Sequence, residues 1–198
     1  MKIFSCNINN IPDCDLREWY NGMSDERKEA VKKLLVAKKQ KSKIVADRIC
    51  RDAVSEFCGI SPEDITFSAN EYGKPYAVGI DVNFSISHSG DYVICAVSEN
   101  KIGADIEKIR EINPEVSKRF ASESEMKYIS SAPNGLFEIW TLKEAYFKCI
   151  GTGLDSNIKN VSFDIKENNI ICSENGYKCS FHNIAEGYIC SVCEEVTK

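Results

Sequence analysis

Residues 101–108 constrain the fold of this 198-residue chain more than any other stretch. Apolar side chains alternate there with small or acidic ones: Ile102, Ala104 and Ile106 with Gly103, Asp105 and Glu107. Because successive side chains of a strand point to opposite faces, the pattern predicts a strand with an apolar face in the core and both carboxylates on the other face. Such a carboxylate pair suits a divalent cation, most often Mg²⁺ where phosphates are handled. An ordinary amphipathic strand with a solvated acidic face has the same pattern.

Length and cysteine content indicate the size and compartment of the protein. A chain of this length can bury its own core, as one domain or as two small halves packed together. The ten cysteines are scattered, and the close pair Cys190 and Cys193 would lie on opposite faces of a strand, which argues against a zinc or redox site. We find no signal peptide and no run of ~20 apolar residues, the length of a membrane helix. We expect a cytoplasmic protein with reduced thiols.

The net charge of −5 argues against general nucleic-acid binding. Positive charge is nevertheless concentrated in residues 27–51, where ten Lys and Arg residues face only Glu29 and Asp47. This segment is either a solvated helix face or a contact with something anionic. It carries no stacking aromatic residues, so it does not resemble a groove for single-stranded nucleic acid.

The predicted helices and strands follow a similar order in the two halves of the chain. A helical apolar pattern follows the N-cap candidate Ser24, includes Leu34 and Leu35, and continues to Gly59. Further helices are predicted at 123–130 and 137–150, and strands at 2–8, 65–68, 83–88, 92–98, 161–165, 170–172, 178–182 and 188–193. Residues 187–194 echo 91–99. The fold class is therefore α+β, with two similar halves at residues 1–99 and 100–198.

A second informative segment covers residues 137–148. Trp140, Glu144 and Lys148 are four residues apart, so a helix would place them on one face. Such a Glu–Lys pair contributes only ~0.2 to 0.5 kcal/mol, and taken alone the segment is better explained as a solvated helix face than as part of a site. In combination with Asp105 and Glu107, however, Glu144 would complete an oxygen site, and Lys148 would neutralise a phosphate bound to the same metal.

A third segment, residues 84–90, contains His88 between Ser87 and Ser89, followed by Gly90. Donors with so little bulk around them suit an anion such as a phosphate. The alternative is a turn histidine with its hydrogen bonds satisfied. The other histidine, His182, lies in a late predicted strand, and we treat it as structural.

Together these motifs resemble the 4′-phosphopantetheinyl transferase superfamily. They are, in order, Gly73-Lys74-Pro75, Phe84 to Gly90, Gly103 to Glu107, and Trp140 to Lys148 followed by Gly151-Thr152-Gly153. Length and the doubled plan resemble the surfactin-synthetase-type branch. The resemblance covers roughly residues 24–154. It implies two α/β halves related by pseudo-twofold symmetry, with the active site in the cleft between them, in a monomer.

The resemblance also implies an activity. Members of the superfamily move the phosphopantetheine arm of coenzyme A to a serine of an apo carrier protein and release adenosine 3′,5′-bisphosphate, as the holo-acyl-carrier-protein synthases do. Asp105, Glu107 and Glu144 fall on the Mg²⁺ ligands, and Lys148 falls on a lysine that contacts the phosphates. Glu144 is also the residue expected to take the serine proton. The carrier would be acyl, aryl or peptidyl, and its docking surface would lie near the junction of the two halves and residues 112–132.

The resemblance also implies which residues of this sequence contact coenzyme A. By the same resemblance they are Arg27, Lys43, Tyr72, Lys74, Ser87 and His88. Lys43 is taken from the sequence Lys41-Ser42-Lys43, where relatives often have a basic residue followed by Ser or Thr. Two other interpretations stay open: a coenzyme A-binding protein without transferase activity, and another Mg²⁺-dependent phosphohydrolase that uses water as nucleophile.

Overall fold

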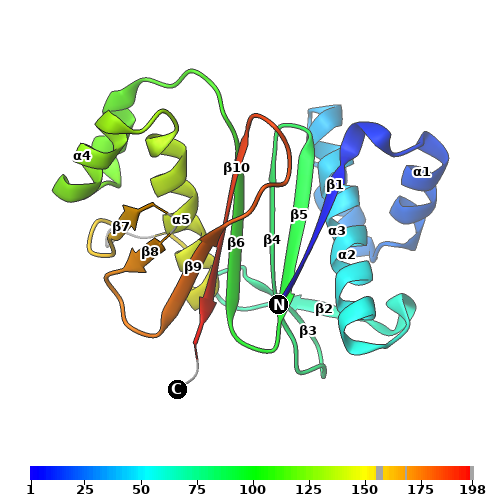
Figure 1. The fold of residues 1–198 in the computed structure, drawn as a ribbon. Helices are drawn as coiled ribbons and strands as arrows, with labels where there is room; N and C mark the ends of the chain where they lie inside the picture. Colours follow the sequence, from blue (N-terminus) through cyan, green and yellow to red (C-terminus); the bar gives the residue numbers. More distant parts are fainter. Residues whose placement is uncertain (155–157, 168, 197–198) are drawn as a thin grey trace.

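Two three-stranded antiparallel sheets lie side by side in the protein (Figure 1). The computed structural model describes residues 1–154, 158–167 and 169–196. The first sheet has the order β1–β5–β4, formed by β1 (Lys2–Asn7), β4 (Asn83–Ser89) and β5 (Tyr92–Ser98). The second has the order β6–β10–β9, formed by β6 (Ile102–Lys108), β9 (Tyr177–Phe181) and β10 (Tyr188–Glu195). The echoing segments 91–99 and 187–194 thus fall on β5 and β10, the central strand of each sheet.

Helices flank the two sheets on opposite sides of the molecule. α1 (Asp13–Gly22), α2 (Asp25–Lys32) and α3 (Ala37–Cys58) lie beside the first sheet, and α4 (Glu123–Ser131) and α5 (Gly135–Ile150) beside the second (Figure 1). Short 3₁₀ helices span Ile8–Asn10, Pro62–Asp64 and Pro114–Arg119. Two small hairpins complete the described chain: β2 (Phe67–Ala69) with β3 (Pro75–Ala77), and β7 (Phe163–Lys166) with β8 (Asn169–Cys172).

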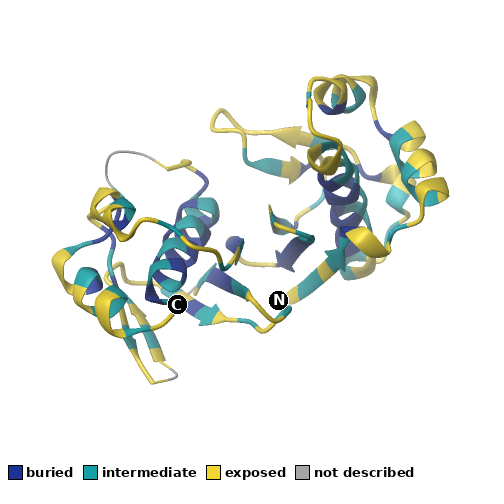
Figure 2. Ribbon diagram, turned by 90° about the horizontal axis from the view of Figure 1, so that it is seen from above, coloured by how far each residue is buried: buried dark blue, intermediate teal, exposed yellow. Residues whose placement is uncertain are grey.

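Three apolar clusters form the core. One joins α3 to the first sheet, and a second surrounds α5. The third joins the two sheets and contains Ile94 and Ala96 of β5, Ile102, Ala104 and Ile106 of β6, and Cys190 and Val192 of β10. The predicted alternation of β6 is therefore confirmed. Cys190 belongs to the third cluster and Cys193 to the second, so their predicted opposite orientations are confirmed as well. Seen from above, buried residues gather on the inner helices and strands (Figure 2).

The sequence predicted a continuous helical pattern from Ser24 to Gly59. This prediction is wrong in the middle of the segment, where α2 ends at Lys32 and α3 begins at Ala37. Ser24 does cap α2, accepting a hydrogen bond from Arg27 N, and Gly59 ends α3 in the left-handed conformation. Between them the chain leaves helical geometry at residues 33–36, and the Leu35 side chain, 99% exposed, packs on nothing. The apolar pattern merged two helices because Leu35 matched the helical period without being a core residue.

Serine side chains hold β4 against β6. Ser85 Oγ accepts a hydrogen bond from Ala104 N (2.9 Å), and Ser89 Oγ accepts one from Lys108 N (3.1 Å). Ser87 Oγ donates to Asp105 Oδ1 and Ser89 Oγ to Glu107 Oε2, each at 2.7 Å. In the described residues the two strands belong to separate sheets. We call this contact the serine seam.

Candidate active site

Gly103 brings β6 unusually close to α5. A Cβ atom at this position would overlap the carbonyl oxygen of Ala145 and the amide nitrogen of Cys149. Glycine is therefore required for the strand to lie directly against the helix backbone. As a consequence, the face of β6 that carries Asp105 and Glu107 meets the face of α5 that carries Glu144 and Lys148.

Asp105 is buried, unlike a carboxylate on a solvated acidic face. Its Oδ1 accepts hydrogen bonds from Ser87 Oγ (2.7 Å) and from Lys148 Nζ (2.6 Å). Its Oδ2 is also buried and has no hydrogen-bond partner in the described part of the chain. Burial raises the pKa of Asp105, while Lys148 and Ser87 act in the opposite direction. One oxygen of this carboxylate is thus left for a group outside the protein.

Glu107 lies at the more open end of the same face. Its Oε2 accepts hydrogen bonds from Ser89 Oγ (2.7 Å) and from Arg110 Nη1 (2.9 Å). No motif pointed to Arg110, whose guanidinium also lies over the Phe137 ring at 5.7 Å from its centroid. Glu107 is therefore held by one residue from each side: Ser89 of the first sheet and Arg110 of the segment that follows β6.

Glu144 is half-buried, and its pKa is raised to about 7. Burial is the largest cause, and the negative charge of Asp105 comes next, partly offset by Lys148, with Glu107 adding to the rise. The three carboxylates therefore lie close enough to disfavour one another's ionisation. Among residues 1–154, 158–167 and 169–196, however, no group of three or more His, Cys, Asp or Glu side chains is arranged to hold a metal ion. The convergence of these carboxylates on one cation stays a prediction.

His88 and Lys43 lie at the edge of this cluster. Desolvation lowers the pKa of His88, and the positive charges of Lys148 and Lys43 lower it further. Lys43 is exposed on α3, and no hydrogen bond or ion pair engages its ammonium within the described residues. Cationic and neutral donors thus gather beside the carboxylates, with a free lysine among them.

The loop before β3 borders a cavity of about 270 Å³. Tyr72, Lys74 and Lys148 all line it, so the structure brings these three predicted residues together. The Lys74 ammonium, however, donates hydrogen bonds to the carbonyl oxygens of Ile102 (3.2 Å) and Cys149 (3.0 Å), and burial lowers its pKa. Lys74 therefore ties the loop to the start of β6 and the end of α5. Its predicted phosphate contact is not tested by these bonds.

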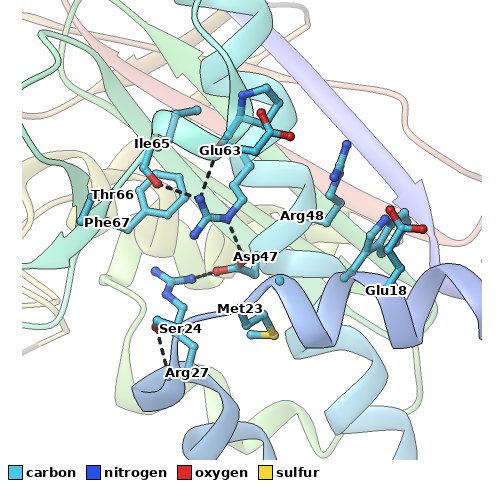
Figure 3. A pocket seen from close by; sticks show the side chains of 14 residues that line it. Glu18, Met23, Ser24, Arg27, Asp47, Arg48, Glu63, Ile65, Thr66 and Phe67 are labelled. Carbon is cyan, nitrogen blue, oxygen red and sulfur yellow. Dashed lines mark hydrogen bonds and ion pairs between the residues drawn. The ribbon is translucent and has the colours of Figure 1, made fainter.

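Arg27 lies elsewhere, lining a cavity of about 500 Å³ (Figure 3). Its guanidinium pairs with the buried Asp47 and lies over the Phe67 ring, 5.2 Å from the centroid. Arg51 reaches the other Asp47 oxygen at 3.0 Å and the same ring at 5.3 Å. The structure does not group Arg27 with Asp105, Glu107 and Glu144. Sequence reasoning missed Asp47, although its spacing of four from Lys43 and Arg51 places it on their face of α3.

Similarity to known families covers nearly the whole described chain. The model of the "4'-phosphopantetheinyl transferase superfamily" matches residues 101–193, and that of "4'-phosphopantetheinyl transferase, N-terminal" matches residues 13–100. In the described residues, no helix is both long and apolar enough to cross a membrane.

Among curated proteins, the chain is similar to the 4′-phosphopantetheinyl transferase gsp of Aneurinibacillus migulanus. The two are 31% identical over 182 residues, which cover 87% of this chain and 76% of the relative. The chain is also 30% identical to the 4′-phosphopantetheinyl transferase Sfp of Bacillus subtilis, over 77% of this chain and 70% of that protein. Among solved structures, the holo-[acyl-carrier-protein] synthase of Thermotoga maritima matches 50% of this chain and 64% of its own, at 18% identity with a TM-score of 0.43.

Proposed function

This chain belongs to the 4′-phosphopantetheinyl transferase superfamily, and we propose the residues with which it moves phosphopantetheine from coenzyme A to a carrier-protein serine. The observation that carries the proposal is the meeting of Asp105 and Glu107 on β6 with Glu144 and Lys148 on α5. All four side chains come from one chain, so a monomer suffices. As parts of the same proposal, the enzyme acts in the cytoplasm and requires Mg²⁺.

The carboxylates fit a divalent cation in two respects. Asp105 Oδ2 is buried without a partner in the described residues, and carboxylate oxygens are the ligands that Mg²⁺ prefers. The pKa of Glu144 is raised in part by Asp105 and Glu107, a repulsion that a cation would relieve. Asp105, Glu107 and Glu144 would hold the ion. When bound, Mg²⁺ would withdraw charge from the coenzyme A pyrophosphate.

Glu144 acts as the base in the transfer. Burial raises the pKa of Glu144 above its ordinary value, which favours acceptance of a proton by this carboxylate. It takes the proton of the carrier serine while that oxygen bonds to the phosphorus attached to the pantetheine arm. The bond from this phosphorus to the bridging oxygen breaks, and adenosine 3′,5′-bisphosphate leaves with that oxygen. Lys148, whose side chain is 30% exposed, stabilises the negative charge on the leaving phosphate.

The nucleotide end of coenzyme A occupies the cavity beside Tyr72, Lys74 and Lys148. His88, Ser87 and Lys43 lie on the phosphate side of this site, where the free Lys43 ammonium and the neutral His88 ring supply donors. Ser87 already donates to Asp105, so its contribution to coenzyme A comes through the position of that carboxylate. Arg27 takes part only after it exchanges Asp47 for a phosphate.

The carrier protein approaches from the side of Glu107. An apolar cavity of about 380 Å³ opens there, and its walls include Ile112, Val116, Phe120 and Trp140. It adjoins both Glu107 and the predicted docking region at residues 112–132. A carrier helix seated over this cavity would present its serine to the carboxylates.

Incubation with coenzyme A, Mg²⁺ and an apo carrier protein tests the proposal. The carrier should gain the mass of one phosphopantetheine arm, and EDTA should prevent the gain. Breakdown of coenzyme A that needs no carrier would instead identify a phosphohydrolase. Binding of coenzyme A without turnover, tried with acyl and peptidyl carriers, would identify a protein without transferase activity.

A further inference from the structure

The turn between β4 and β5 is fastened through Asp91, by its carboxylate and by its backbone, whose carbonyl oxygen accepts from Ile8 N at 2.8 Å. Ser89 and Tyr92 face each other, so Gly90 and Asp91 form a two-residue connection. The Asp91 carboxylate pairs with Lys38 (2.7 Å) and with Lys108 (3.2 Å). Asp91 N donates to the Tyr188 hydroxyl at 2.9 Å, and that hydroxyl in turn donates to Asp91 Oδ2 at 3.4 Å.

The partners of Asp91 come from elements that carry or border the candidate active site. Lys38 lies in the first turn of α3, the helix of Lys43. Lys108 directly follows Glu107 at the end of β6, and Tyr188 begins β10, which pairs with β6. Asp91 itself comes three residues after His88. Asp91 thus links α3, β6 and β10 to the end of β4.

Ser89 connects this turn to Glu107. Its hydroxyl donates to Glu107 Oε2 at 2.7 Å while it accepts from Lys108 N at 3.1 Å. The position of Ser89 depends on how the turn packs against β6. Packing is tight, because Gly90 has φ +57 and a Cβ there would overlap the Tyr188 hydroxyl and lie 2.7 Å from Lys108 Cδ.

Asp91 has little to contribute to overall stability. The side chains of Lys38 and Lys108 are 51% and 50% exposed, and exposed ion pairs stabilise proteins only slightly. The carboxylate instead holds the turn in a fixed position, because the Lys38 and Lys108 ammoniums and the Tyr188 hydroxyl all contact it. The position of the turn matters because the side chains that hydrogen-bond to a metal ligand set the orientation of that ligand.

We infer that Asp91 is a positioning residue for the metal site: it holds the turn so that Ser89 orients Glu107. This inference rests on the proposed function and extends it, because it assigns Mg²⁺ affinity to a residue that touches no reacting atom. It also explains why the turn of one sheet is fastened to the strand of the other.

The test combines metal binding with turnover. Mg²⁺ is titrated calorimetrically into the full chain with coenzyme A present, and transfer to an apo carrier is measured over a range of Mg²⁺ concentrations. Asp91→Ala should weaken Mg²⁺ binding about 10-fold, as losses of ligand-orienting partners do, and should raise the half-activating Mg²⁺ concentration in parallel. The melting temperature should move by no more than about 2 °C. Asp91→Glu, which keeps the charge, should recover most of the affinity.

Two further variants sharpen the result. Glu56→Ala removes another exposed ion pair between distant segments, Lys2–Glu56 at 3.3 Å, and should leave Mg²⁺ binding unchanged. Ser89→Ala should weaken binding, and adding Asp91→Ala to it should cost little more if both act along one path.

Unchanged Mg²⁺ binding in Asp91→Ala would overturn the inference, as would a drop in melting temperature with normal Mg²⁺ dependence. If wild-type protein with coenzyme A binds no Mg²⁺, the proposed metal site itself fails. The two failures are therefore distinct. Should Asp91→Ala not fold, Asp91→Asn removes the charge with almost no change of shape and yields the same comparison.

Discussion

Lys148 of α5 and Asp105 of β6 form an ion pair, with Nζ 2.6 Å from Oδ1. The pair joins the helix that carries Glu144 to the strand that carries Glu107. It leaves the second Asp105 oxygen buried and without a partner in the described residues. Lys148 and Asp105, which the sequence assigned to phosphate and to metal, thus contact each other.

Replacing Glu144 by Gln should reduce kcat for phosphopantetheine transfer by at least ~100-fold, because the proposed base and one predicted metal ligand are lost together. The amide has the same shape, so circular dichroism and the melting temperature should stay close to those of the wild type. The mass of the carrier protein after incubation gives the measurement. Glu138→Gln on the same helix, which keeps an acceptor for the Tyr128 hydroxyl, serves as control and should retain the rate. Normal turnover by the Glu144 variant would refute its assigned role.

Metal-free protein should lose stability as the pH rises from about 4.5 to about 7. The pKa of Glu144 is raised from 4.5 to about 7 in the folded state, so in this range the folded protein holds a proton that the unfolded chain has released. Ionisation in the folded state therefore costs stability, on the order of 1 kcal/mol after allowance for solvent screening. Urea unfolding in EDTA at pH 5 and pH 8 measures the loss. Glu144→Gln should remove it, and an identical slope in that variant would assign the pH dependence to other groups.

Gly103→Ala should destabilise the protein by several kcal/mol, because the added Cβ overlaps backbone atoms of Ala145 and Cys149 and forces β6 away from α5. Transfer activity should fall further than the folded fraction does, since Asp105 moves relative to Lys148. Gly22→Ala is the matched control. A Cβ at Gly22 meets nothing within 4 Å, so its denaturation midpoint should remain unchanged or rise slightly.

His88→Ala should raise KM for coenzyme A more than KM for 3′-dephospho-coenzyme A, because the ring lies beside Lys148 and Lys43 on the proposed phosphate side. Equal increases for both donors would contradict a contact with the 3′-phosphate. Lys74→Ala provides an instructive comparison, since its ammonium also bonds two carbonyl oxygens. If Lys74 reaches the 3′-phosphate, it shows the same selectivity as His88. If its role is to hold the loop in place, KM rises equally for coenzyme A and 3′-dephospho-coenzyme A, and the melting temperature falls.

Local sequence patterns predicted much of this fold. Alternation placed β6 and separated Cys190 from Cys193, and the spacing of Glu144 and Lys148 placed them on one face of α5. Caps at Ser24 and Gly59 were also predictable, because each depends on neighbouring residues only. α1 and β3 were missed, and the break at residues 33–36 was hidden by Leu35, which fits the helical period but is exposed.

The contacts that complete the site were harder to predict, because their partners lie far apart in the sequence. Nothing local indicates that Ser89 meets Glu107 or that Lys74 reaches the carbonyl of Cys149. Likewise, Arg27 was assigned through the family resemblance, whereas the ion pair with Asp47 decides where its guanidinium lies. Such contacts between residues distant in the sequence depend on how the two sheets pack, and no short motif predicts that packing.

The serine seam makes the two parts of the chain interdependent. Ser87 and Ser89 come from one sheet, while the carboxylates of Asp105 and Glu107 that they bond come from the other. A chimera that takes residues 1–99 from a relative and keeps residues 100–198 would therefore need hydroxyl groups at the positions of Ser87 and Ser89. Without them the grafted protein would fold around correctly placed cores and still carry misaligned carboxylates at Asp105 and Glu107. Recombination between relatives is thus limited at this junction by the hydrogen bonds of the seam as well as by the apolar cluster that joins the two sheets.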